Sequence, residues 1–289
     1  MGVSRRGRRI VVASVCFGAL AAAGLVARQL WLTDTARVVD AQDAIDRFHD
    51  QQASTDAAVA SSTTAAVDAE GPTSSAGTTT TVPPLATLAT PGVYRYATIG
   101  TEAIDVLGGT RHDYPAETLL TVTTEGCGVR MRWDLLEERW EDMAVCATTD
   151  GIELQQSSRN YHEFFQHGQE QAVQCDRTTP LVPADGAPRP ADTLSCVQAG
   201  NPWVPVWQVI GRESIDVEGA PVDVTHVRMT VQDDDEYWEH ITADYWFDDH
   251  GLPVRMTSTK ENRSSSGLVG DVVYRETLRA DLVSLTPLT

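Results

Sequence analysis

Short segments in which hydrophobic and polar residues alternate fill the chain from residue 93 to about residue 288. Successive side chains of a β-strand point to opposite faces of its sheet, so this period of two predicts strands that bury one face. The pattern is carried by 119–124, 129–134, 140–147, 152–158, 222–231, 241–247, 252–259 and 272–285. Glycine and aspartate, which favour tight turns, separate these segments. The region is therefore expected to be mainly β, an antiparallel meander that forms a curved sheet, a half-barrel or a two-sheet structure.

Two copies of one motif divide the alternating region. IGTEAIDVLGG at 99–109 and IGRESIDVEGA at 210–220 are identical at seven of eleven positions. Each copy precedes a run of alternating segments, so the fold is expected to contain two related meanders, with duplication of one ancestral half as a hypothesis. The proline-rich stretch 177–207 between the halves is expected to be an irregular crossover.

The first part of the chain contains an uncharged run instead of an alternation. Residues 10–27 carry no charged side chain, and apolar character resumes at 30–32. A run of this length can span a bilayer, and the arginines of RRGRR at 5–9 keep their flank on the cytoplasmic side. We therefore expect a cytoplasmic stub at 1–9, a transmembrane helix at 10–32 that acts as a signal anchor, and an extracytoplasmic C-terminal region. The alternative is a signal peptide that is cleaved near the alanines at 21–23.

A linker in two parts is predicted between this span and the alternating region. In 33–50, hydrophobic residues recur at intervals of three and four, which is typical of a short juxtamembrane helix. These residues are Val38, Ala41, Ile45 and Phe48. Residues 51–92 are rich in serine, threonine, alanine and proline and contain no aromatic residue, so they predict a disordered stalk. The stalk would hold an extracytoplasmic β domain, residues 93–289, some tens of ångströms above the lipid.

Charge excludes one class of partner. The chain has a formal net charge of −19, and because the first 32 residues contain five arginines and no acidic residue, the remainder carries −24. A surface of that sign repels the phosphate groups of nucleic acids. We therefore expect no nucleic-acid partner. The partner that the sequence does predict is the lipid bilayer, through the N-terminal helix.

Four cysteines lie beyond the predicted membrane span. An even number in an exported domain favours two disulfides, and chain order favours Cys127 with Cys146 and Cys175 with Cys196. Four cysteines allow three pairings, so the order is an expectation. A zinc site is disfavoured, because the spacing contains no C-x2-C pair and no histidine at ligand distance from a cysteine.

Asp248, Asp249 and His250 form a cluster that suggests catalysis or metal binding, within WFDDHGLPVRM at 246–256. The flanks alternate like two strands, and aspartate and glycine are the residues that a tight connection needs. The cluster is therefore interpreted as the polar tip of a hairpin.

Two further clusters are also interpreted as structural. HEFFQH at 162–167 resembles the zinc-protease motif, but its histidines are five residues apart instead of four, which separates them on a helix or a strand. The acidic run at 233–236 lacks the alternate spacing and central glycine of a calcium loop and is expected to be a solvated hairpin tip. The sequence predicts no catalytic residue, no metal site and no cofactor.

Side chains that break their local pattern are the candidates for ligand binding. Glu276 lies on the apolar face of the last predicted strand, and His226 lies where a bulge or a change of face must occur. A buried carboxylate can line a ligand cavity, although a salt bridge to an arginine is the simpler explanation. Trp203 and Trp207, in NPWVPVW, could cover a pocket, although core packing is the usual role of such residues.

The second half of the chain resembles the LolA and LppX-like envelope lipoproteins and related exported β proteins. The resemblance is carried by IGRESIDVEGAPVDVTHVRM and ADYWFDDHGLPVRMTSTKE, and it covers about residues 207–284. It implies a half-barrel with a hydrophobic hollow for lipid chains. The chain differs from that family in its predicted membrane span, which stands in place of a lipidated cysteine, and in its two predicted disulfides.

These observations predict a single-pass protein of the cell membrane with an extracytoplasmic binding or scaffolding role in the cell envelope. The expected ligand is a lipid or another apolar molecule, or a protein partner in the envelope, and no enzymatic activity is expected. One alternative is a hydrolase that uses paired carboxylates, which are plentiful in the sequence. Another is a purely structural envelope protein.

Overall fold

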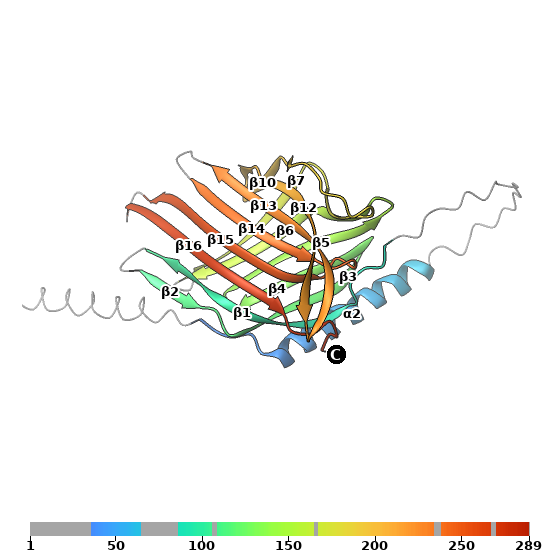
Figure 1. Ribbon diagram of the computed structural model, residues 1–289. Coiled ribbons are helices and arrows are strands. Elements are labelled where there is room, and N and C mark those ends of the chain that lie inside the picture. The colour runs from blue at the N-terminus through green and yellow to red at the C-terminus, as the bar shows by residue number, and fades with distance from the viewer. Residues whose placement is uncertain are drawn as a thin grey trace, which may run out of the picture.

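One antiparallel sheet that curls into a half-barrel makes up most of the protein (Figure 1). The computed structural model describes residues 36–64, 86–105, 109–164, 167–233, 238–266 and 270–288. The predicted mainly β fold and its half-barrel form are confirmed. The predicted transmembrane helix at 10–32 lies outside the described residues. Within the described ranges, no helix is long and apolar enough to cross a membrane.

The first half of the sheet is a meander in which most consecutive strands pair with each other. Its strands are β1 (Gly92–Ile104), β2 (Thr110–Asp113), β3 (Glu117–Glu125), β4 (Gly128–Leu136), β5 (Arg139–Thr148), β6 (Gly151–Phe164) and β7 (His167–Cys175). β2 is a side branch that pairs with β1 alone, and the next strand along the main path is β3.

The second half is a meander of five long strands. They are β12 (Val206–Val217), β13 (Ala220–Asp233), β14 (Glu239–Phe247), β15 (Pro253–Ser266) and β16 (Gly270–Leu282). Four short strands connect the halves: β8 (Thr179–Pro183), β9 (Asp192–Thr193), β10 (Cys196–Gln198) and β11 (Asn201–Trp203).

The two meanders join through the first and last long strands, β1 and β16, which pair from Tyr96 opposite Leu282 to Ile104 opposite Tyr274. Along the sheet, strand numbers fall from β7 to β1 and again from β16 to β12, so both halves progress in the same direction. This order is what a tandem duplication would produce. Duplication itself stays a hypothesis.

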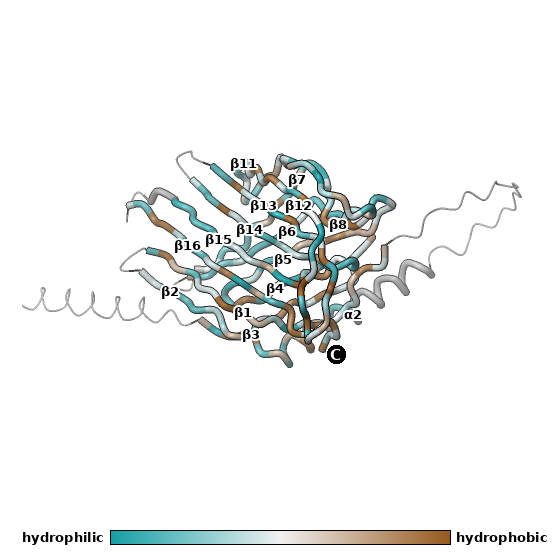
Figure 2. The backbone as a smooth tube through the Cα atoms, viewed as in Figure 1, coloured by the Kyte–Doolittle hydropathy of each residue, from teal (hydrophilic) through white to brown (hydrophobic). Residues whose placement is uncertain are grey.

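Alternation along the strands fills the concave interior with side chains, and the tube in Figure 2 changes from hydrophilic to hydrophobic and back along many strands. The interior has two chemically different ends. We call the end where β1 finishes and β16 begins the polar end, and the opposite one the apolar end. The apolar end is packed with buried aromatic and aliphatic residues, including Tyr94, Tyr96, Val145, Ile152, Phe247 and Met256.

The hairpin of β12 and β13 contains the irregularity that the sequence placed near His226. The pairing shifts between Val209 and Gly211, so the bulge lies in β12, directly opposite His226. Gly211 has φ of 152°, in a region that side chains with a Cβ rarely adopt. Ile215 and Val217, beyond the bulge, are buried.

Helix α2 (Ala41–Thr64) is longer than the helix that the sequence predicted within the linker. Asp40 caps its start, because the Gln42 backbone amide donates to the Asp40 carboxylate at 2.7 Å. The helix continues through 51–64, which the composition had assigned to the disordered stalk, and this stretch is rich in alanine, the best helix former. Residues 65–85, the centre of the predicted stalk, lie outside the described residues.

The helix is also not free-standing. It lies on the outer face of the sheet beside β1 and β3 (Figure 1). Ala44 and Phe48 are buried there against Val93 and Leu119. The Arg47 guanidinium reaches the Asp134 carboxylate of β4 at 3.0 Å. The predicted apolar stripe therefore packs against the sheet of the same chain.

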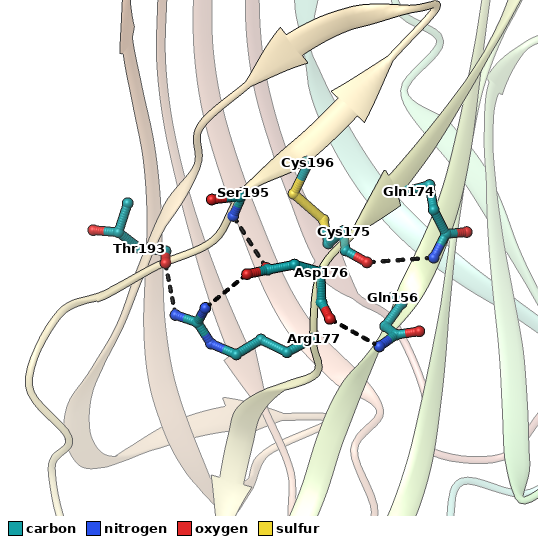
Figure 3. The surroundings of a disulfide bond; sticks show 8 residues. All are labelled: Gln156, Gln174, Cys175, Asp176, Arg177, Thr193, Ser195 and Cys196. Carbon is teal, nitrogen blue, oxygen red and sulfur yellow. Dashed lines mark hydrogen bonds and ion pairs between the residues drawn. A yellow bond between two sulfur atoms is a disulfide. The ribbon is translucent and has the colours of Figure 1, made fainter.

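Both predicted disulfides are present, Cys127 with Cys146 and Cys175 with Cys196. The second joins the end of β7 to β10 and so links the two ends of the first part of the crossover, as Figure 3 shows. Around it, the Asp176 carboxylate accepts the Ser195 backbone amide at 3.1 Å, and Arg177 donates to the Thr193 carbonyl at 2.7 Å. The crossover is irregular, as expected, but it also contributes short strands to the sheet.

Candidate functional site

Ionisable side chains from six strands meet inside the half-barrel at its polar end. They come from β1 and β2 on one side, from β5 and β6 on another, and from β15 and β16. We call this group the polar cluster: Glu102, His112, Tyr114, Arg139, Glu141, His162, Lys260, Tyr274 and Glu276. The curl of the sheet brings β5 opposite β15 and β16, so residues more than a hundred positions apart come into contact.

Glu276 and Arg139 form the centre of the polar cluster. Both side chains have 0% exposure, and the Arg139 Nε donates to Glu276 Oε2 at 2.9 Å. The same oxygen accepts the hydroxyl groups of Tyr274 at 2.8 Å and of Tyr114 at 3.0 Å. The ion pair with an arginine, which the sequence suggested as the simpler explanation of Glu276, is therefore present.

Lys260 and Glu141 make a second bridge across the interior. The Lys260 ammonium lies 3.1 Å from Glu141 and 3.2 Å from Glu276, and Arg139 donates to Glu141 at 2.8 Å. Each cation thus lies between the same two carboxylates. The attraction between these cations and carboxylates holds β5 against β15 and β16 across the interior of the half-barrel.

Glu102 organises the histidines of the polar cluster. It lies directly opposite His112 in the pairing of β1 with β2, and its Oε1 is 2.8 Å from His112 Nδ1. Its Oε2 accepts the Tyr274 hydroxyl at 3.1 Å and lies 3.8 Å from His162 Nδ1. The His112 ring also stacks on Phe164, with ring centres 5.0 Å apart.

The cations keep the buried carboxyl groups ionised. Burial alone would raise the pKa of Glu141, but Lys260 and Arg139 lower it to about 2. Burial opposes ionisation of Glu276 too, but the same two cations hold the pKa of Glu276 well below its ordinary value. Burial and then the Arg139 charge lower the pKa of His162, which favours a neutral ring.

Hydrogen bonding in the polar cluster is incomplete. Arg139 Nη1 is buried and has no hydrogen-bond partner within the part of the chain that the structure describes. Leaving a donor of a charged group unpaired in the interior costs on the order of 1–3 kcal/mol or more. Three members of the cluster retain solvent contact: the side chains of Glu141 and Lys260 are 16% exposed and that of His162 is 26% exposed. The cluster is therefore partly open and has hydrogen-bonding capacity to spare.

The side chains at the apolar end are closely packed. Tyr96, Phe247, Met256 and Val145 have 0% exposure, so none of them lines a space that a water molecule could enter. The Tyr96 ring packs against Trp133, with ring centres 4.6 Å apart. These side chains fill the part of the interior where an acyl chain would be expected to lie.

The four candidate ligand-binding residues do not meet in one site. Glu276 belongs to the polar cluster, whereas Trp207 is buried in the core beside Tyr245. His226 points to the outer face, where it stacks on Trp246 and lies 2.6 Å from the Asp244 carboxylate.

Trp203 has a separate role at the margin of the sheet. Its indole Nε1 donates to Glu239 at 2.8 Å, which links β11, at one margin of the sheet, to the start of β14 in the second meander. Part of the Trp203 side chain also packs against the core.

The Asp248 cluster is a turn, as the sequence indicated. The Asp248 carboxylate accepts the backbone amides of His250 at 2.9 Å and Leu252 at 2.8 Å. Asp249 pairs with Arg212 at 2.7 Å, and the His250 side chain is exposed. Burial raises the pKa of Asp248, while the two backbone amides oppose that shift.

The two remaining motifs lie on hairpins. His162 and His167 stand on the paired strands β6 and β7, and only His162 has a described side chain. The acidic run follows the end of β13 at Asp233, and 234–237 lie outside the described residues. Among the side chains that the structure describes, no group of three histidine, cysteine or acidic residues is arranged to hold a metal ion.

Sequence reasoning missed most members of the polar cluster, although a signal was available. Glu141 shares its strand face with the apolar residues Met143 and Val145, and Lys260 shares its face with Met256. Each therefore breaks an apolar face in the way that Glu276 does. Arg139 gave no comparable signal, because it lies at the first position of β5.

Comparison with known proteins adds no further assignment. No protein-family model, curated protein or solved structure matches the chain.

Proposed function

We propose that this chain is a membrane-anchored, extracytoplasmic binding protein of the cell envelope, and that the polar cluster binds its ligand. The observation that carries the proposal is the buried Arg139 guanidinium, which has an unpaired N–H beside ionised carboxylates in a partly open interior. Buried donors in a purely structural network are nearly always paired. Ionisable groups with perturbed pKa values inside a concavity are typical of functional sites.

The expected ligand is a small polar molecule or head group that carries both hydrogen-bond donors and acceptors. The solvent-accessible members of the cluster, Lys260, Glu141 and His162, supply both kinds of partner. The curled antiparallel sheet has the form that a resemblance to the LolA and LppX-like proteins implies. The packing of Tyr96 and Phe247 at the apolar end supports a polar ligand over a lipid chain.

The charge state of the carboxyl groups supports binding over hydrolysis. A glycosidase pair needs one carboxyl group with a raised pKa that can donate a proton. Here the pKa values of Glu141 and Glu276 are both lowered by Arg139 and Lys260. Neither group would carry a proton at neutral pH.

Thermal unfolding of the full chain in lipid nanodiscs tests the proposal. The probes are small carboxylates, amines, zwitterionic amino acids and monosaccharides. At least one class is expected to raise the Tm of the wild type, because a ligand that binds only the folded state stabilises it. The shift should disappear in Lys260→Met and persist in Arg279→Gln, whose side chain is 53% exposed on the outer face of β16. A Tm that no probe raises, or equal shifts in all three proteins, would contradict the proposal.

A further inference from the structure

We propose that the polar end of the half-barrel faces the bilayer at close range, and that the segment 65–85 does not separate the β domain from the membrane. This inference depends on the membrane anchor of the proposed function. It goes beyond that function by specifying which end of the domain faces the lipid. Four observations support it.

The chain is already attached to the β domain at Arg37. The Arg37 backbone amide donates to the Glu138 carboxylate at 2.9 Å, and the Arg37 carbonyl accepts the Glu137 amide at 2.9 Å. Its guanidinium pairs with both glutamates. Backbone and side chain are therefore both held, so the linker meets the folded domain at this residue.

Few residues separate this attachment from the predicted span. Five residues lead from Leu32, the last residue of that span, to Arg37. A fully extended chain covers at most about 3.6 Å per residue, so this connection reaches no further than about 18 Å. The stalk that composition predicted at 51–92 would instead have held the β domain some tens of ångströms above the lipid.

Arg37 is attached at the polar end. Glu137 and Glu138 form the turn between β4 and β5, and the next residue is Arg139, at the centre of the polar cluster. The Glu163 amide beside His162 donates to the Glu138 carbonyl at 2.9 Å. Figure 1 places the start of the described chain at the same end of the sheet as β2 and the start of β16.

The segment 65–85 begins and ends at the opposite end. The first half of helix α2 packs against Val93, near the start of β1, and Figure 1 shows the helix continuing away from the polar end. Its 24 residues span about 36 Å at 1.5 Å per residue. The chain re-enters the described structure at residue 86 and starts β1 at Gly92, at the apolar end. The serine- and threonine-rich residues therefore connect two points on the side of the domain away from the anchor.

Two consequences follow for the domain on the membrane. A ligand of the polar cluster arrives from the bilayer surface, so a polar head group presented there is within its reach. Ser/Thr modification of 65–85 would decorate the face that points into the envelope, without changing the distance between domain and lipid.

Fluorescence quenching in nanodiscs tests this arrangement on the full chain. A Cys16→Ser background removes the one cysteine of the sequence that is not in the two described disulfides, and a fluorophore is attached through Val38→Cys or Thr149→Cys. Val38 is 58% exposed beside Arg37, and Thr149 is exposed in the turn between β5 and β6 at the apolar end. With nitroxide groups on the lipid heads, quenching at position 38 should be several-fold stronger than at position 149. Deletion of residues 67–83 should leave both values unchanged.

The outcomes separate this inference from the proposed function. Equal quenching at both positions, or stronger quenching after the deletion, overturns the orientation while leaving the anchor and the ligand site in place. Failure of the full chain to co-purify with nanodiscs overturns the anchor, and the orientation with it. Strong quenching at position 38 alone supports both.

Discussion

Asp248 illustrates, at the scale of the residue, how an acidic side chain becomes buried for a local reason. Its carboxylate accepts hydrogen bonds from two backbone amides of a turn. Both amides are donors, so they cannot pair with each other and would otherwise need a water molecule as acceptor. Asp249 and His250, its neighbours in the sequence, lack this role, because both side chains are exposed. The three residues that looked like one cluster therefore differ in function.

Alanine substitution should separate these three residues. Asp248→Ala is expected to lower the free energy of unfolding by about 1–3 kcal/mol, because it leaves two amides without their acceptor. Asp249→Ala is the matched control and should cost less than about 1 kcal/mol, since it removes an exposed ion pair. Urea unfolding measures both, and equal costs would contradict the role assigned to Asp248.

The central ion pair of the polar cluster should behave as a coupled unit. Arg139→Met or Glu276→Leu alone is expected to cost about 3–5 kcal/mol, because each leaves a buried charge without its partner. The double variant should cost clearly less than the sum of the two. A double-mutant cycle from chemical unfolding measures the coupling, and additive costs would argue against the pair.

A buried charged residue could be predicted from the sequence only where it interrupts the apolar face of a strand. Glu276 was found from sequence because it interrupts an apolar face, and Glu141 and Lys260 carry the same signal. Which partners they meet was not predictable, because alternation places a side chain on a face without specifying which strand lies across the interior.

Helix α2 shows, at the scale of the element, why composition misjudged the linker. Alanine, serine and threonine lack the bulk to form a core, so residues 51–64 looked disordered. Helix propensity and a docked first half are enough to continue the helix through them. Phe48 is the residue whose burial fixes that first half on the sheet.

Removal of the Phe48 ring should release the helix. Phe48→Ala is expected to weaken docking by about 2 kcal/mol, from the apolar area returned to water. Hydrogen exchange of the amides in 41–54 should accelerate, while the amides of β14 stay protected. His49→Ala, on the exposed side of the same turn, should leave exchange unchanged. Unchanged exchange in Phe48→Ala would show that docking does not depend on this ring.

Strand prediction succeeded where one face is apolar and the other polar. Seven long strands, β3 to β6 and β13 to β15, overlap segments predicted from alternation, and β16 does so too. β7 was missed because His167–Cys175 is mostly polar on both faces and pairs through its backbone. The short crossover strands carry too few residues to show a period.

The curl of the sheet determines, at the scale of the whole molecule, what the interior can contain. A meander predicts which strands are neighbours, but the closure of β5 against β15 and β16 depends on the twist of the whole sheet. That closure places charges at one end and packed rings at the other. The polar cluster is therefore a property of the tertiary fold that no single segment encodes.

Acid should weaken this closure in a defined pH range. Because the pKa of Glu141 is lowered from 4.5 to about 2, its stabilising contribution is complete above pH 4.5 and disappears as the pH falls to about 2. Glu141→Gln should therefore be less stable than the wild type above pH 4.5, and the difference should shrink towards pH 2. Glu117→Gln, at an exposed ion pair, should show no such range. Urea unfolding at several pH values measures this, and a pH-independent difference would contradict the assigned shift.

The most direct test of a ligand site in the polar cluster is a high-resolution crystal structure of the protein as purified from its own cells. We expect ordered electron density larger than one water molecule, in contact with the solvent-accessible members of the cluster, Lys260, Glu141 and His162. A cluster that holds only single waters, with an acyl chain between Tyr96 and Phe247 instead, would contradict the account.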